Sequence, residues 1–135
     1  MRVFIDASAW VAKAVSNDQW APELRRVMRE LRGGRIELVT TTWTLYEALA
    51  VARRRKPGAT QLLFRDALAN SRVVAVDPEV EQEALQRFLA WDDHGASIVD
   101  HANTLVAAQL RCQGLLSFDA DFVPLAAAAG IRLLR

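Results

Sequence analysis

Four acidic residues fall where a short apolar run ends or where a helix is expected to begin: Asp6, Glu47, Asp100 and Asp119. Carboxylates brought together without a lysine or arginine among them repel one another, so they require protons or cations. An all-oxygen ligand set without clustered Cys or His suits Mg²⁺ or Mn²⁺ better than zinc. Because such ions bridge phosphates and activate water, these residue types point to a nuclease or a phosphatase.

Each of these acids also has a purely structural interpretation. Asp100 lies three residues after Ser97, and Glu47 lies three residues after Thr44, the spacing of a capping box in which the acid stabilises a helix start. The two acids that follow apolar runs would instead cap a helix or belong to a turn. The combination of all four acids, rather than any one of them, favours chemistry over capping.

Apolar periodicity places the four acids within an alternation of strands and helices. Strands are expected at residues 3–5, 36–40, 73–76, 115–118 and 131–134. Helices are expected at residues 7–15, from 21 to the glycines at 33–34, from 44 to the Pro-Gly pair at 57–58, and at 59–70, 79–91, 98–111 and 123–129. This alternation predicts an α/β domain with a mostly parallel sheet. Ligands bind beyond the carboxyl ends of parallel strands, so Asp6 and Asp119 converge if their strands are neighbours.

The same periodicity predicts which helix faces pack inward. The helix from residue 98 is rich in Ala and Leu on most sides, which indicates a buried central helix. Two other helices are expected to bury wide apolar stripes. These stripes are Leu62, Leu63, Ala67 and Leu68 in one helix, and Val80, Ala84, Leu85, Phe88 and Leu89 in the other.

Length and composition indicate one ordered domain over residues 1–135, with 52% hydrophobic and 24% charged residues. The net charge is +1, and 15 of the 17 basic residues are arginine, a side chain suited to bidentate phosphate contacts. A genomic base-composition bias explains the same excess equally well. The single cysteine, Cys112, cannot form an internal disulfide, which favours the cytoplasm. The N-terminus shows neither a signal peptide nor a membrane span.

The sequence resembles a PIN domain, and more narrowly the VapC-type toxins of prokaryotic toxin–antitoxin pairs, over essentially its whole length. The motifs that carry the resemblance are residues 3–9, residues 44–48 around Glu47, the pattern Asp93-x-x-x-Ser97-x-x-Asp100, and residues 116–122. The resemblance implies a three-layer α/β/α fold with a five-stranded sheet in the order 3-2-1-4-5. In that order the first and fourth strands lie side by side, which brings Asp6 and Asp119 together.

The resemblance also implies an endoribonuclease that depends on Mg²⁺ or Mn²⁺, with one or two ions held by the four acids. Glu47 would act directly or through water, and Asp121 would be an auxiliary ligand, because Asp119 is nearer to the expected strand end. A further set of residues would support the ligands: Ser8, Asp93, Ser97 and Asn103. Helix capping is the alternative role of the two serines, and Asn103 either reaches a metal-bound water or is an ordinary exposed or buried amide.

The partners implied by the resemblance are an RNA substrate, a cognate antitoxin and a second copy of the chain in a homodimer. Arg53, Arg54 and Arg55 form the densest basic group, which would guide RNA, bind a partner, or simply be solvated. Two other functions remain open: a catalytically silent RNA- or protein-binding module, and another Mg²⁺-dependent phosphoesterase. Receiver-type and dehalogenase-type phosphotransfer sites fit less well, because both use a late lysine and none follows Lys56.

Overall fold

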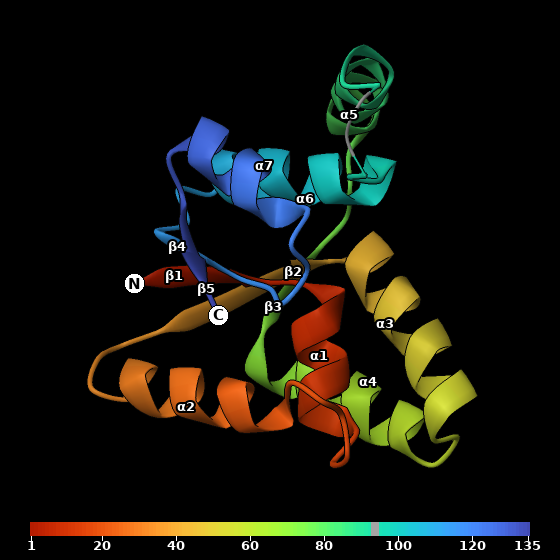
Figure 1. Ribbon diagram of the computed structural model, residues 1–135, viewed down its shortest axis with the longest axis vertical. Coiled ribbons are helices and arrows are strands. Elements are labelled where there is room, and N and C mark those ends of the chain that lie inside the picture. The colour runs from red at the N-terminus through yellow and green to blue at the C-terminus, as the bar shows by residue number, and fades with distance from the viewer. Residues whose placement is uncertain (93–94) are drawn as a thin grey trace.

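A sheet of five parallel strands, in the order β3-β2-β1-β4-β5, lies at the centre of the molecule (Figure 1). The structure is a computed structural model that describes residues 1–92 and 95–135. Its strands are β1 (Arg2–Ile5), β2 (Glu37–Thr41), β3 (Arg72–Val74), β4 (Gly114–Leu116) and β5 (Arg132–Leu134). The predicted strand order is therefore confirmed. It places β1 between β2 and β4, with Phe4 paired to both Val39 and Leu115.

Helices cover both faces of this sheet, which confirms the three-layer architecture. They are α1 (Ala7–Ala14), α2 (Ala21–Leu31), α3 (Thr42–Arg55), α4 (Ala59–Asn70), α5 (Pro78–Ala90), α6 (Ile98–Gln109) and α7 (Phe122–Ala129). Figure 1 shows α5, α6 and α7 on one side of the sheet and α1, α2 and α4 on the other. Among the described residues, no helix has both the length and the apolarity that a membrane span requires.

Two hydrophobic cores lie on the two faces of the sheet, because successive side chains of a strand point to opposite faces. Val3 and Ile5 of β1 belong to the core shared with α1, α2, α3 and α4. Phe4, between them, belongs to the core shared with α5, α6 and α7. The α6 helix is buried over residues 100–107, as its composition predicts.

The predicted inward stripes of α4 and α5 are wrong for five residues. In α4, Leu63 and Ala67 are buried, whereas Leu62 is 65% exposed. In α5, Val80 and Ala84 are buried. The other residues predicted to pack inward are exposed: Leu68, Leu85, Phe88 and Leu89. The physical reason is that an outer helix contacts its neighbours along one narrow face, so only the middle of a wide apolar stripe becomes covered.

Candidate active site

Asp6 lies where β1 ends and α1 begins. Its backbone N–H donates to the carbonyl oxygen of Leu116 at the end of β4, which continues the pairing of β1 with β4 by one residue. Its side chain accepts from the backbone N–H of Ser8 and so caps α1. The capping interpretation and the proximity to β4 are therefore both correct, because one carboxylate at a strand end can serve both.

Three further donors hold the Asp6 carboxylate, which is 4% exposed. Its Oδ2 accepts from the hydroxyl of Ser117 at 2.9 Å and from the hydroxyl of Ser8 at 3.1 Å. Its Oδ1 accepts from Nδ2 of Asn103 at 3.3 Å. Burial raises the pKa of Asp6, while the bonds from Ser117, Ser8 and the local backbone act in the opposite direction. The carboxylate is thus fixed in orientation although it is almost completely buried.

Asp100 lies in the first turn of α6, within the predicted capping box. Its Oδ2 accepts from the backbone N–H of Ser97 at 2.9 Å, and the hydroxyl of Ser97 accepts from the backbone N–H of Asp100 at 3.1 Å. The carboxylate is buried, and this burial raises its pKa to about 7, against the opposing effect of the Ser97 amide. The nearby charges of Asp6, Asp119 and Glu47 raise the pKa of Asp100 further.

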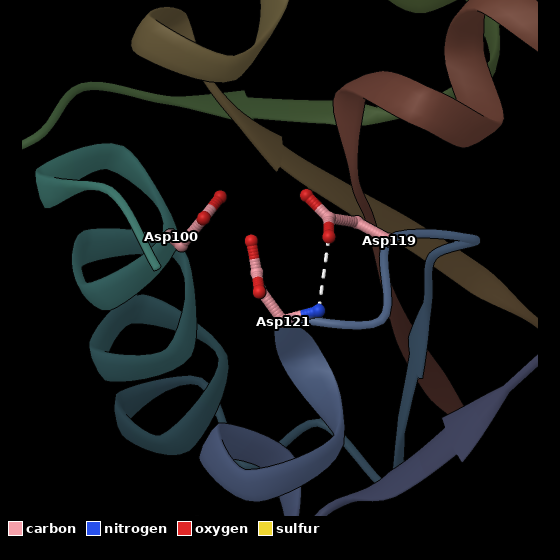
Figure 2. A group of neighbouring side chains, drawn as sticks. All are labelled: Asp100, Asp119 and Asp121. Carbon is pink, nitrogen blue, oxygen red and sulfur yellow. Dashed lines mark hydrogen bonds between the residues drawn. The ribbon is translucent and has the colours of Figure 1, made fainter. Parts of the chain in front are cut away.

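Asp119 and Asp121 lie in the loop between β4 and α7. The strand ends at Leu116 rather than at residue 118 as predicted, so Asp119 follows it by three residues. Oδ1 of Asp119 accepts from the backbone N–H of Asp121 at 2.9 Å, which folds the loop back on itself (Figure 2). One carboxylate oxygen from each of Asp100, Asp119 and Asp121 lies within 4.8 Å of the others. Figure 2 shows these three side chains converging from α6 and from the loop.

Glu47 reaches the same region from α3, although its predicted capping box is absent. The helix begins at Thr42, and its N-cap is Thr41, whose hydroxyl accepts from the backbone N–H of Thr44. Glu47 therefore lies in the second turn and is exposed as a residue. Although the residue is exposed, its carboxylate is partly buried. This burial raises the pKa of Glu47, and the charges of Asp6 and Asp119 raise it further.

Asn103 links α3 to Asp6 through its fully buried carboxamide. Its Oδ1 accepts from the hydroxyl of Thr44 at 2.6 Å and from that of Thr41 at 3.3 Å. Since an ionised carboxylate only accepts hydrogen bonds, the amide nitrogen of Asn103 faces Asp6, and its Oδ1 is left to accept from the two hydroxyls. The sequence left two roles open for Asn103, contact with a metal-bound water and an ordinary exposed or buried amide. In the structure it is a buried amide whose nitrogen donates to the Asp6 carboxylate.

Ser117 is a site residue that the sequence prediction missed. Its fully buried hydroxyl donates to Asp6 and accepts from the backbone N–H of Asp119 at 3.1 Å. The available signal was a hydroxyl inside an otherwise apolar segment, directly between two residues of a quoted motif. Buried polar side chains need partners, so this position pointed to a hydrogen-bonding role.

The donor set fits a hard divalent cation. Burial raises the pKa of Asp6, Glu47 and Asp100, and the charges of neighbouring carboxylates raise the pKa of Glu47 and Asp100 further. Within residues 1–92 and 95–135, no lysine or arginine forms an ion pair with any acid of the site, that is, with Asp6, Glu47, Asp100, Asp119 or Asp121. A cation bound by carboxylate oxygens would relieve this repulsion, and oxygen ligands suit Mg²⁺ or Mn²⁺.

The remaining predicted residues lie away from the carboxylates, serve as helix caps, or lie outside the described residues. Arg53 and Arg54 are exposed near the end of α3, whereas Arg55 forms an ion pair with the buried Asp18. Asp93, predicted to support the metal ligands, lies outside the described residues. The hydroxyl of Ser97 accepts from the backbone N–H of Asp100, which is its capping role.

Comparison with protein-family models gives a match to the PIN domain over residues 3–128. No curated protein matches the sequence. The match extends from β1 through α7, and it includes all four predicted catalytic acids together with Asp121, Asn103 and Ser117.

Several solved structures share the fold at low sequence identity. The chain is similar to *Mycobacterium tuberculosis* VapC20, a sarcin-ricin loop cleaving toxin, with 24% identity, a TM-score of 0.82, and coverage of 96% of this chain and 95% of that one. *Rickettsia felis* VapBC2 bound to promoter DNA gives 10% identity, a TM-score of 0.69, and coverage of 98% and 97%. *Neisseria gonorrhoeae* FitAcB gives 11% identity, a TM-score of 0.62, and coverage of 98% and 96%.

Proposed function

The chain belongs to the PIN-domain family, and from this premise we propose that it is a metal-dependent endoribonuclease, the toxin of a toxin–antitoxin pair. The observation that carries the proposal is the convergence of carboxylates from β1, α3, α6 and the β4–α7 loop, which are electrostatically coupled to one another. A structural cap explains one such residue, but it does not explain a cluster that has no ion pair with a lysine or arginine among the described residues. Phosphodiester hydrolysis uses such a cluster.

In this proposal one or two divalent ions would be held by the carboxylates of the site. Asp100, Asp119 and Asp121 would offer one carboxylate oxygen each, and Asp6 would offer the carboxylate that its hydrogen bonds hold in place. Glu47, the exposed acid on α3, would contact an ion directly or through water. Mg²⁺ or Mn²⁺ bound there would lower the pKa of water and neutralise charge on the phosphate. Ser8, Ser117 and Asn103 keep Asp6 in one orientation, so the ligand set is preorganised.

The partners follow from the same proposal. The substrate is RNA, and the similar M. tuberculosis protein, a sarcin-ricin loop cleaving toxin, makes that loop the first substrate to test. We expect a cognate antitoxin to cover the acidic site, since similar structures include toxin–antitoxin complexes. We also expect a homodimer and a cytoplasmic location.

The decisive variant is Asp100→Asn. Asparagine keeps an oxygen that accepts from the Ser97 amide, so the capping box survives while the charge is lost. Cleavage of structured RNA in Mg²⁺ or Mn²⁺ should fall to background, and the metal-free protein should melt at the same temperature or higher. The matched control is Glu30→Gln, an exposed acid of α2 that pairs with Arg26, and it should cleave like the wild type.

Other outcomes separate the competing functions. Equal cleavage by the wild type and by Asp100→Asn would rule out this active site. RNA binding without cleavage or metal-induced stabilisation would indicate a silent binding module. Hydrolysis of small phosphoesters, with RNA left intact, would indicate another phosphoesterase.

A further inference from the structure

A hollow of about 450 Å³ lies between α3 and α4. Tyr46 lines it and directly precedes Glu47 in the chain. From there the hollow follows the two helices away from the acidic site. The residues that line it and its continuation along α4 include Tyr46, Leu49, Arg53, Arg54, Phe64 and Arg65.

The hollow carries positive charge that the protein does not neutralise. Arg53, Arg54 and Arg65 are exposed, and none of them forms an ion pair with any residue that the structure describes. Their basic neighbours differ in this respect, because Arg55 pairs with Asp18 and Lys13 pairs with Asp66. Three free guanidinium groups on one surface favour an anionic ligand with several charges.

Two aromatic rings lie beside these guanidinium groups in the open. Tyr46 is 61% exposed and Phe64 is 42% exposed. An exposed aromatic ring in a positively charged groove is a platform on which an unpaired nucleotide base stacks, while the arginines bind the phosphates. A purely ionic surface would not need the rings, and a purely apolar docking surface would not carry three arginines.

Helix geometry aligns this surface with the acidic site. Tyr46 and Arg53 are seven residues apart on α3, as are Glu47 and Arg54, so each pair shares one helix face. Seven residues span about 10 Å along the helix axis. An RNA strand held at the carboxylates would therefore run along α3, from the negatively charged surface to the positively charged one. The acids repel the flanking phosphates, and the arginines attract them.

A second copy of this chain is the competing occupant. A two-fold contact through this face would set the same patch against itself. The three free arginines of one copy would then face those of the other, at a cost in electrostatic repulsion. Charge complementarity thus favours a polyanion over a second copy.

We propose that this hollow binds the unpaired strand of the RNA substrate next to the cleaved bond. Bases stack on Tyr46 and Phe64, and the phosphates contact Arg53, Arg54 and Arg65. This inference rests on the proposed ribonuclease function, because it assigns the substrate path of that same site.

The test measures binding of a fluorescently labelled RNA stem-loop to the Asp100→Asn chain by anisotropy, between about 50 and about 200 mM salt. The Arg53→Gln/Arg54→Gln variant should bind about tenfold or more weakly, and the slope of log affinity against log salt should fall by about two. The matched control, Arg25→Gln/Arg29→Gln, removes two exposed arginines of α2 and should leave both values unchanged. An equal loss in both double variants would overturn the proposal, since any exposed arginine would then suffice.

Stacking is tested separately at Tyr46. Tyr46→Ala should weaken binding about fivefold or more without changing the salt slope, and Tyr46→Phe should restore it. Wild-type cleavage is measured in parallel. If the wild type cuts RNA while all the hollow variants bind normally, this inference fails and the proposed function stands. If the wild type cuts no RNA, the function itself fails. Variants that only lower the oligomeric mass, measured by light scattering, would assign the face to a second copy.

Discussion

Asp6 shows how a nearly buried carboxylate is kept in place. The hydroxyls of Ser8 and Ser117 donate to one oxygen, and Asn103 donates to the other. These bonds offset part of the free-energy cost of burial, which would otherwise favour the neutral acid. The site thus depends on neutral residues as much as on its acids, because the neutral residues fix the orientation of the Asp6 carboxylate.

Ser117→Ala tests this dependence. The change removes a donor to Asp6 and the acceptor of the Asp119 backbone N–H, so both ligands lose a restraint. We expect RNA cleavage to fall about tenfold or more and Mn²⁺ affinity, measured calorimetrically, to fall by a similar factor. Ser71→Ala, which removes a hydroxyl bonded to the Ala67 carbonyl far from the site, should change neither. Unchanged Mn²⁺ affinity in Ser117→Ala would show that the hydroxyl only stabilises the fold.

The pKa of Asp100 predicts how metal binding depends on pH. Its ordinary value is 3.8, and the folded protein raises it to about 7. Between these values the folded state binds more protons than the unfolded state, so without metal this group's contribution to the unfolding free energy falls as pH rises. A metal must displace the Asp100 proton, so its affinity rises over the same range.

The increase in melting temperature caused by Mn²⁺ should therefore be larger at about pH 8 than at about pH 5.5. Differential scanning fluorimetry at a fixed metal concentration measures this increase. In Asp100→Asn the pH dependence should be weaker, because one of the titrating ligands is gone while Asp6 and Glu47 remain. A Mn²⁺-induced shift that is equal at both pH values in the wild type would contradict the assignment of Asp100 as a ligand.

At the scale of elements, α4 shows how narrow a helix contact can be. Leu62 is 65% exposed and its neighbour Leu63 is 1% exposed, since adjacent residues point about 100° apart on a helix. Of these two leucines, only Leu63 belongs to the core that α4 shares with α1 and α3. Two leucines that look equivalent in the sequence pattern therefore contribute very differently to stability.

Leu63→Ala should lower the free energy of unfolding by about 2–5 kcal/mol, because it leaves a cavity in the core. Leu62→Ala should lower it by less than about 0.5 kcal/mol, because the side chain is already in water. Urea denaturation of the metal-free protein measures both values, and each variant serves as the control of the other. Similar losses in the two variants would mean that α4 is rotated relative to this structure.

Local spacing predicted the helix starts at Asp6 and Ser97, because a cap depends on residues within one turn. It misplaced the start of α3, since Thr41 and Thr44 both have capping chemistry and only tertiary packing selects Thr41. The contacts of Asn103 with Thr44 and Asp6 join positions 59 and 97 residues apart, so no local pattern reveals them. The strand order came from family resemblance, because periodicity alone permits several orders.

For the molecule as a whole, the central place of β1 between β2 and β4 has a consequence for synthesis. Asp6 is synthesised well before its pairing partner β4 and before the acids Asp119 and Asp121. A nascent chain that has not reached β4 lacks a neighbour for one side of β1, and it lacks two of the proposed cation ligands, Asp119 and Asp121. The ribonuclease that we propose is therefore expected to be inactive toward the ribosome that makes it until β4 and the loop after it have been synthesised.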